Sequence, residues 1–435
     1  MKKTKSMNRR GFLRAATGAA LGAPMFIPAA ARGRDGNTAP SNRITMGFIG
    51  TGSQGMGIMG GLLGRNDVQM VAVCDVDRNR VNNARNRVNN HYRNEDCAAY
   101  ADFRALIGRG DLDAVGMALP DHWHTIPAVA AAQAGLDIYG EKPLSRSIRE
   151  SRAICDAVKR YGRIWQTGSQ QRSSENFRFA CELVRNGVIG KVHTVEVGLP
   201  NGPSTGPRQP LPVPEHLDWN MWLGPAPWRP FTNFGRGGPH WDWRWIMDYS
   251  CGQLTDWAGH HIDIAHWGLD LDHTGPTEVE GVGSFPSEGI FDAPTSYRFT
   301  CKYETGVEII VANQSQHPHG MGARWIGEHG WVHVNRGGLN ASNPAWLQRD
   351  ILGSNAIRLY RSNNHIGNFI DCVKTRRETI VPAETGCRSI SVAHLGEIAM
   401  LTGRKIRWNP VTEEIQGDPQ ASALLSRAYR EPWRL

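Results

Sequence analysis

Residues 44–55 read ITMGFIGTGSQG, an apolar run that ends in a glycine-rich loop with the spacing Gly-x-Gly-x-x-Gly. At this spacing the first glycine permits a tight turn, the second lets the backbone approach a pyrophosphate, and the third lets a helix pack on the strand. The N-terminus of that helix then faces the phosphates. The segment therefore predicts the start of a dinucleotide-binding domain. The expected contacts are Gly50, Gly52, Ser53, Gln54 and Gly55.

Apolar runs go on alternating with helical patterns as far as residue 168. Short apolar strands separated by helices are typical of a parallel sheet that is covered on both faces. The expected strands are 44–49, 69–74, 114–119, 136–139 and 164–167, and the expected helices lie near 53–64, 78–90, 124–134 and 147–161. Residues 44–168 are thus predicted to form a Rossmann domain of the α/β class.

The pattern changes over 169–435, where strands carry one apolar face. Such alternation predicts an antiparallel sheet with one side buried. The clearest strands are 192–197, 297–303 and 307–311, the last two joined at Thr305-Gly306, and helices return near 365–376 and 385–403. We expect a C-terminal α+β domain with a large, mainly antiparallel open sheet.

Ten of the 25 prolines lie between residues 199 and 240, and eight of the 15 tryptophans lie between Trp219 and Trp267. This composition predicts a long excursion over 199–250 without a core of its own. Aromatic rings offer large apolar faces for a sugar ring, so one or two tryptophans are expected to line a substrate pocket, with Trp245 as the candidate. The others are expected to pack the excursion against the core.

Asp75 lies at the end of the second expected strand. A carboxylate at that point accepts hydrogen bonds from the adenosine ribose and repels a 2′-phosphate. NAD is therefore the expected cofactor, and NADP is disfavoured. Arg78 is near enough in the sequence to pair with a phosphate, which weakens the preference.

Glu141-Lys142-Pro143 follows another expected strand, at the sheet edge where ligands of such folds bind. Lys142 can donate a hydrogen bond to a substrate oxygen there and stabilise developing negative charge. A surface ion pair beside a proline turn is the alternative for this motif taken alone.

Asp256 and His260 stand four residues apart and share one face if their segment is helical. A carboxylate there can hold the imidazole in one tautomer, and an oriented imidazole suits the exchange of a hydroxyl proton. Zinc is the alternative, with His260, His261, Asp263 and His266 as ligands. That spacing is not typical of zinc sites, and adjacent histidines diverge on a helix, so no metal is expected.

Three further residues are weaker candidates. Arg172 follows the last strand of the first domain near the expected cleft, so a substrate anchor and a structural role both remain open. His124 follows Pro120 and opens a helix, where contacts in the first turn suffice to explain it. His394 lies in an apolar helical pattern and is expected in the core.

The first 31 residues have the three parts of a secretory signal: a basic start, a short apolar middle and small residues before a cut. Paired Arg9-Arg10 followed by Phe12-Leu13 resembles a twin-arginine signal. We therefore expect export to the periplasm, with a linker at 32–43. A basic tail followed by a flexible linker is the alternative.

Charge and cysteine usage exclude other classes. Six of the eight formal positive charges lie in residues 1–31, which leaves +2 and no support for a nucleic-acid groove. No other stretch approaches the about 18–20 apolar residues of a membrane-spanning helix, so the mature chain is expected to be soluble. The eight cysteines include no Cys-x-x-Cys pair and are expected as buried thiols rather than four disulfides.

These motifs together resemble the Gfo/Idh/MocA oxidoreductase family, which contains glucose–fructose oxidoreductase and inositol dehydrogenases. The resemblance covers nearly the whole mature chain. It rests on Gly50 to Gly55, Pro120-x-x-x-His124, Glu141-Lys142-Pro143, the segment 183–192 and Asp256-x-x-x-His260. Residues 217–227 resemble the exported bacterial branch, and Cys251 replaces one glycine of a common run of three.

The resemblance implies a role for each motif. Lys142, Asp256 and His260 match the catalytic residues that take the hydroxyl proton while hydride passes to nicotinamide. Beyond the resemblance, we expect Pro120, His124 and Glu141 to contact the cofactor, and Arg172, Trp245 and His261 to contact the substrate. We also expect a homo-oligomer formed through the C-terminal sheet.

The expected function is an NAD-dependent oxidoreductase that takes hydride from a ring hydroxyl of a sugar, glycoside or cyclitol. Free nicotinamide nucleotides are not expected outside the cytoplasm, so an exported enzyme would hold NAD tightly and recycle it in place. The alternatives are an NAD-dependent redox-elimination glycosidase and a non-catalytic sugar- or cofactor-binding protein. A matched acid–base set disfavours the binding protein.

Overall fold

The computed structural model describes residues 38–232, 234–235 and 238–435. Residues 44–435 form one compact unit, and a short 3₁₀ helix, Pro40–Asn42, belongs to a separate N-terminal unit. The predicted signal at 1–31 and most of the predicted linker lie outside the described residues. Within the described part of the chain, no helix is both long enough and apolar enough to cross a membrane.

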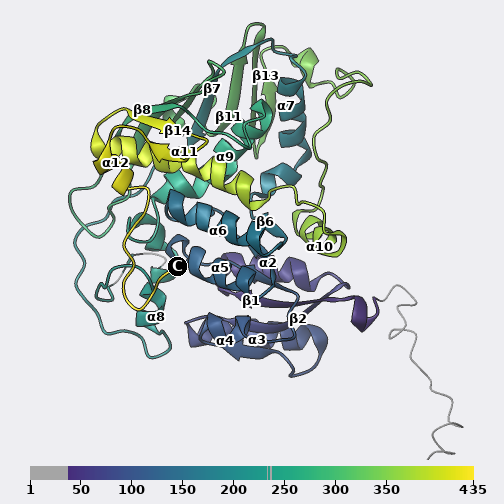
Figure 1. Cartoon of the computed structure of the whole chain (residues 1–435), viewed down its shortest axis with the longest axis vertical. Coiled ribbons are helices and arrows are strands. Elements are labelled where there is room, and N and C mark those ends of the chain that lie inside the picture. The colour runs from purple at the N-terminus through teal and green to yellow at the C-terminus, as the bar shows by residue number, and fades with distance from the viewer. Residues whose placement is uncertain (1–37, 233, 236–237) are drawn as a thin grey trace, which may run out of the picture. The chain divides into compact units, whose positions relative to one another are not determined.

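The first sheet has six parallel strands in the order β3-β2-β1-β4-β5-β6 (Figure 1). The strands are β1 Ile44–Ile49, β2 Val68–Cys74, β3 Ala98–Tyr100, β4 Ala114–Met117, β5 Asp137–Gly140 and β6 Trp165–Thr167. The helices are α2 Ser53–Leu63, α3 Arg78–Tyr92, α4 Phe103–Ile107, α5 Thr125–Gln133 and α6 Ile148–Arg160. The predicted Rossmann sheet is confirmed, and β3 and α4 are additions. The strand order reverses between β1 and β4, which is where ligands of such sheets bind.

Alternating side chains of β1 enter two different cores. Met46 and Phe48 pack beneath α2 and α3, whereas Ile49 points to the opposite face. Gly47 also lies toward that opposite face, where a Cβ would stand 2.7 Å from Leu106 of α4. The tight packing of α4 therefore explains why this strand carries a glycine among apolar residues.

The second sheet has nine strands in the order β13-β12-β11-β7-β10-β9-β8-β14-β15. Its neighbours pair antiparallel except for β7 and β10, so the predicted mainly antiparallel sheet is confirmed. The strands are β7 Val192–Leu199, β8 Glu278–Ser284, β9 Ser296–Lys302, β10 Glu308–Asn313, β11 Gly322–Gly327, β12 Gly330–Asn335, β13 Gly338–Ala341, β14 Ile406–Asn409 and β15 Glu414–Ile415. The helices are α7 Glu175–Arg185, α8 Trp219–Leu223, α9 Gly252–Leu269, α10 His365–Thr375, α11 Ala383–Thr402 and α12 Pro419–Ala423.

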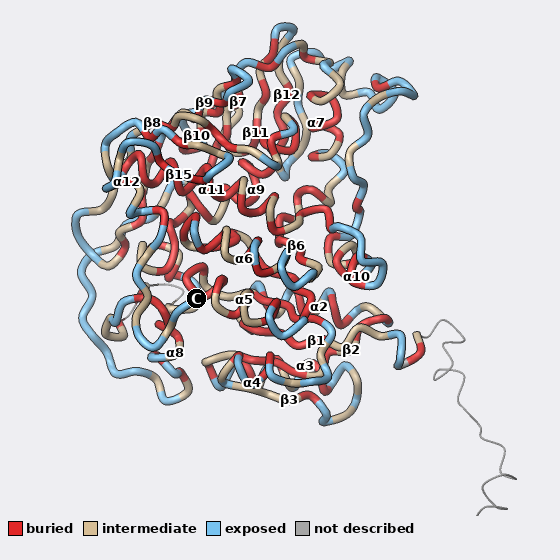
Figure 2. The backbone as a smooth tube through the Cα atoms, viewed as in Figure 1, coloured by how far each residue is buried: buried red, intermediate tan, exposed pale blue. Residues whose placement is uncertain are grey.

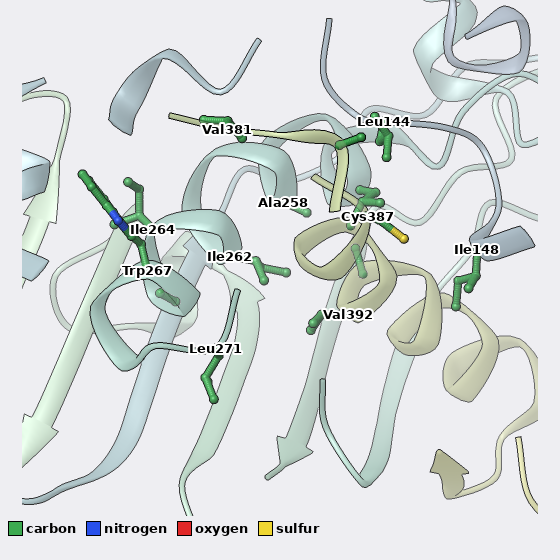
Figure 3. Close-up of a cluster of buried hydrophobic side chains, with 14 of the residues drawn as sticks. Leu144, Ile148, Ala258, Ile262, Ile264, Trp267, Leu271, Val381, Cys387 and Val392 are labelled. Atoms are coloured by element: carbon green, nitrogen blue, oxygen red, sulfur yellow. The ribbon is translucent and has the colours of Figure 1, made fainter. Parts of the chain in front are cut away.

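Helices α9 and α11 lie between the two sheets. They pack on each other, α9 packs on β7 and β11, and α11 packs on β8 and α6 (Figure 1). Both helices are buried over most of their length (Figure 2). Ala258 and Ile262 of α9 and Cys387 of α11 lie in the apolar cluster drawn in Figure 3. One continuous hydrophobic core therefore joins the two sheets and fixes the position of α9 relative to the first sheet, β1–β6.

The excursion over 199–250 has a small hydrophobic core of its own, so the prediction that it lacks one is wrong. Trp219 and Trp222 stack with ring centroids 4.7 Å apart. The cluster consists of Leu217, Trp219, Trp222, Leu223, Ala226, Phe234, Trp243, Trp245, Ile246, Tyr249 and Phe291. The physical reason is that aromatic side chains bury enough area to hold a segment that has little regular structure.

All eight cysteines are buried and unpaired, as predicted.

Candidate active site

A cavity of about 810 Å³ opens at the carboxyl ends of β1, β2, β4 and β5. The glycine loop and Asp75 line one end, and Lys142, Asp256 and His260 line the other. The remaining walls include residues of the excursion, of the turn between β12 and β13 and of the segment 170–177. Residues from well-separated parts of the chain thus converge on one space.

The glycine loop forms a cradle that side chains would fill. A Cβ on Gly55 would lie 2.0 Å from the Gly50 carbonyl oxygen, and Gly50 has a φ of +86°. A Cβ on Gly52 would approach only Arg80, at 3.6 Å, so the loop backbone is open to the cavity at this point. Helix α2 begins directly after it at Ser53. This arrangement fits a dinucleotide pyrophosphate at the helix N-terminus.

Asp75 braces the glycine loop from the end of β2. Its Oδ2 accepts hydrogen bonds from the Thr51 backbone nitrogen at 2.7 Å and from the Thr51 hydroxyl at 3.0 Å. Burial raises the pKa of Asp75 against the opposing effect of these donors. The arginine that lines this end of the cavity is Arg80, whereas Arg78 is exposed and does not line it. The arginine that could pair with a 2′-phosphate and weaken the preference for NAD is therefore Arg80 rather than Arg78.

Lys142 and Asp256 form an ion pair inside the cavity. Lys142 Nζ donates a hydrogen bond of 2.6 Å to Asp256 Oδ1, and Arg244 Nε lies 3.8 Å from the same oxygen. Burial alone would raise the pKa of Asp256, but the charges of Lys142, Arg244 and Arg336 hold it below its usual value. Within the described residues no hydrogen bond joins Asp256 to His260. The expected orientation of His260 by Asp256 is therefore wrong: the carboxylate turns to the ammonium group instead.

His260 is buried, and its ring meets Trp257 edge-on with centroids 5.4 Å apart. Burial lowers the pKa of His260 well below its usual value, and the charges of Lys142 and Arg336 lower it further. The Gln171 amide, oriented to suit its neighbours, donates to the His260 carbonyl at 2.9 Å and accepts from Arg336 Nε at 3.2 Å. The imidazole is thus neutral at pH 7 and positioned by packing.

Glu141 and Pro120 line the cavity as predicted, and His124 does not. Burial raises the pKa of Glu141 to about 7, and its Oε1 accepts a hydrogen bond from Gln170 at 3.2 Å. His124 lies behind the wall, with Nδ1 2.6 Å from the Pro143 carbonyl and Nε2 2.8 Å from the Leu119 carbonyl. It therefore lies between two backbone segments of the wall, close to both carbonyls.

The three predicted substrate contacts all lie outside the cavity. Arg172 is buried and engaged by Asp263 and Asp272, with nitrogen–oxygen distances of 2.7–2.9 Å to their carboxylates. His261 stacks on Trp257, with ring centroids 5.6 Å apart, and does not line the cavity, because successive residues of a helix point in different directions. Trp245 is used in the excursion's own core.

Two of the four residues considered for zinc have other partners. Asp263 binds Arg172, and His266 Nε2 lies 2.7 Å from the Tyr303 hydroxyl. Across the described ranges, no group of three potential metal ligands is close enough to hold an ion. His394 is a satisfied core residue as predicted, with Glu397 and the Ser145 carbonyl as partners.

Several cavity residues were missed by the sequence reasoning. Trp241, Trp243 and Arg244 lie within the tryptophan-rich run, so the run itself was the signal although the wrong member was chosen. Others include Arg80, Gln170, Gln171, His240, Trp257, Asn335 and Arg336. No sequence pattern around Arg336 could have indicated its place in the cavity, because the turn that carries it is brought to α9 by the folding of the nine-stranded sheet.

Two family models match the chain. Residues 44–169 match the one described as "Oxidoreductase family, NAD-binding Rossmann fold", and residues 202–435 match the one described as "Oxidoreductase family, C-terminal alpha/beta domain", both of the Gfo/Idh/MocA group. Together the matches include both halves of the cavity.

Individual relatives match over shorter stretches. Levoglucosan dehydrogenase of Pseudarthrobacter phenanthrenivorans is 33% identical over 111 residues, which cover 26% of this chain and 28% of the relative. Myo-inositol 2-dehydrogenase of Thermotoga maritima is 28% identical over 171 residues, which cover 39% of this chain and 47% of the relative. This chain therefore spans less than half the length of these two curated relatives.

A similar solved structure is the WlbA dehydrogenase from Bordetella pertussis in complex with NADH and UDP-GlcNAcA. Its TM-score is 0.63 at 15% identity, and the match covers 84% of this chain and 99% of that one. This is a likeness of fold.

Proposed function

Because its two halves match both family models, the chain belongs to the Gfo/Idh/MocA oxidoreductase family, and we propose that it oxidises a ring hydroxyl of a sugar, glycoside or cyclitol with bound NAD. One observation carries the proposal. The glycine loop and the group of Lys142, Asp256 and His260 line a single cavity, so a dinucleotide on the loop and a substrate beside these side chains would share it.

The three side chains divide the proton chemistry. His260 is neutral at pH 7 and accepts the proton of the substrate hydroxyl. Lys142 donates a hydrogen bond to the same oxygen and stabilises its developing negative charge. Asp256 holds the ammonium group of Lys142 in the cavity. When bound, NAD supplies the hydride acceptor.

The proposal includes a cofactor that stays bound between turnovers and is recycled by a second sugar or by return of the hydride. Contacts between the excursion and the segment after β2 support it. The Asp218 nitrogen donates to the Val76 carbonyl at 3.0 Å, and the Arg78 nitrogen donates to the His216 carbonyl at 2.8 Å. These bonds hold the excursion beside Asp75, at the end of the cavity where the nucleotide would bind. Retention of this kind would suit an exported enzyme, and export through a twin-arginine signal remains part of the proposal.

The test uses the purified chain without added nucleotide. After a desalting column, the protein is mixed with sugars, glycosides and cyclitols, and reduced nicotinamide is followed by absorbance. A substrate-dependent rise supports the proposal. Release of the aglycone from a chromogenic glycoside without net reduction would favour the redox-elimination glycosidase. A protein that passes the column empty and works only with added NAD would contradict the recycled cofactor but not the oxidation.

A further inference from the structure

Arg336 occupies the turn between β12 and β13 and lines the cavity close to His260. The turn is held in place by Asn335, whose Oδ1 accepts hydrogen bonds from the Gly337 nitrogen at 2.7 Å and the Gly338 nitrogen at 3.1 Å. The backbone that carries Arg336 is therefore fixed before any ligand binds.

The guanidinium group of Arg336 is also oriented. It lies over the Trp257 ring at 4.7 Å from the centroid, and its Nε donates to Gln171 at 3.2 Å. Among the described residues, no carboxylate lies within ion-pair distance of it, and its two terminal nitrogens make no hydrogen bond. The fork of Nη1 and Nη2 is left available to a ligand. An arginine that is stacked and held through Nε loses little freedom when this fork binds.

Positive charge exceeds negative charge around this end of the cavity. Lys142, Arg244 and Arg336 face the single ion-paired carboxylate of Asp256. Arg244 lies between the rings of Trp241 and Trp243 at 4.6 and 4.5 Å, so it cannot turn away to solvent. Glu141 and Asp121 are the other acidic groups nearby. Burial raises the pKa of both, that of Glu141 to about 7, so Glu141 is only partly charged at neutral pH. A neutral sugar would leave this excess uncompensated.

We propose that the substrate carries a carboxylate, as a uronic acid does, and that Arg336 binds it through its paired terminal nitrogens. The inference rests on the proposed function, since it places a sugar beside Lys142 and His260. A planar carboxylate matches one guanidinium fork in bidentate geometry. A phosphate with its additional charged oxygen would require further donors, and Arg336 is the one unpaired arginine of the described cavity wall near His260.

The test measures binding, so it does not depend on turnover. Titration calorimetry on the full chain with its nucleotide compares glucuronate, galacturonate and mannuronate with their parent sugars and with glucose 6-phosphate. At least one uronate is expected to bind more tightly than its parent sugar. Arg336→Gln is expected to raise the uronate Kd by about 10- to 100-fold and to leave the neutral-sugar Kd within about twofold. Arg336→Lys, which keeps the charge without the fork, should recover only part of the affinity.

Arg298→Gln is the matched control, because Arg298 is exposed on β9 outside the cavity and its loss changes the net charge equally. The proposal is overturned if no uronate binds more tightly than its parent, if Arg336→Gln leaves the uronate Kd unchanged, or if glucose 6-phosphate is preferred. Oxidation of neutral sugars with no uronate binding would reject this inference and retain the proposed function. Uronate binding that depends on Arg336, without reduction of the nicotinamide, would support this inference and reject the proposed oxidation.

Discussion

Lys142 Nζ and Asp256 Oδ1 lie 2.6 Å apart, and they join the end of β5 in the first sheet to helix α9 beneath the second. The two side chains are 12% and 19% exposed, so the pair faces the cavity without being free in solvent. An ammonium group held in this way keeps its position while substrates exchange. His260, one helical turn after Asp256, then supplies a neutral imidazole beside a fixed cation.

Lys142→Ala and His260→Ala are each expected to abolish sugar oxidation and to leave nucleotide binding nearly intact. For His260→Ala the loss should be about 10²- to 10⁴-fold, because a positioned acid–base group contributes that much. Steady-state rates and nucleotide titration measure the two effects. His193→Ala, on the exposed face of β7, is the control. Either cavity variant retaining most of its turnover would show that its residue has been assigned wrongly.

Glu141→Gln is expected to change how stability depends on pH. Burial raises the pKa of Glu141 from 4.5 to about 7 in the folded chain. Between these values the folded chain keeps a proton that the unfolded chain has released, so the free energy of unfolding falls as pH rises. The loss of free energy of unfolding is on the order of 3 kcal/mol when complete.

Urea unfolding of the nucleotide-free chain at several pH values would measure this effect. Relative to the native chain, Glu141→Gln should gain stability from about pH 4.5 to pH 7 and show no further change above that range. Glu414→Gln, at an exposed position on β15, should run parallel to the native chain. Parallel curves for the native chain and Glu141→Gln would contradict the raised pKa.

Local patterns predicted the parts of the site that a single strand–turn–helix unit builds. The glycine loop, Asp75 and Lys142 all lie just after strands whose apolar runs are visible in the sequence. The partner of Asp256 could not be predicted in this way, since the helix places His260 on the same face but the tertiary fold brings Lys142 nearer. Arg172 follows the last strand of the first sheet, next to the cleft, yet the carboxylates of Asp263 and Asp272 hold its side chain away from the cavity.

NAD is expected to bind more tightly than NADP, because a 2′-phosphate beside Asp75 would place like charges in contact. Asp75→Asn should narrow the difference by about tenfold, and it keeps an acceptor for Thr51 that Asp75→Ala would remove. The measurement is the ratio of the Kd values for NADP and NAD in each variant. Asp96→Asn, at an exposed position, is the control. Equal or tighter NADP binding by the native chain would show that Arg80 outweighs Asp75.

Gly55→Ala and Gly57→Ala, both in α2, are expected to have opposite effects. A Cβ at position 55 would lie 2.0 Å from the Gly50 carbonyl, whereas a Cβ at position 57 meets nothing within 4 Å. Gly55→Ala should cost about 1–3 kcal/mol of stability and lose nucleotide binding. Gly57→Ala should gain about 0.5–1 kcal/mol from helix propensity. Urea unfolding measures the stability of each variant, and nucleotide titration measures its binding. Equal changes in the two variants would contradict the close packing of Gly55 on Gly50.

His240→Ala is expected to speed the release of bound nucleotide. His240 belongs to the excursion and lines the cavity, and its Nε2 lies 2.9 Å from Asp77 Oδ2 at the start of α3. Burial lowers the pKa of His240, so at pH 7 the neutral ring donates this hydrogen bond through Nε2. One hydrogen bond of this type contributes about 0.5–1.5 kcal/mol, which corresponds to a release rate about 2- to 10-fold higher when it is lost.

Release can be followed by trapping the freed nucleotide with an excess of a dehydrogenase that binds it. His273→Ala, at an exposed position away from the cavity, should release nucleotide at the native rate. If His240→Ala also releases it at the native rate, the excursion does not control retention at this contact. Faster release with unchanged oxidation of a bound sugar would instead show that the excursion secures the cofactor and takes no part in the chemistry.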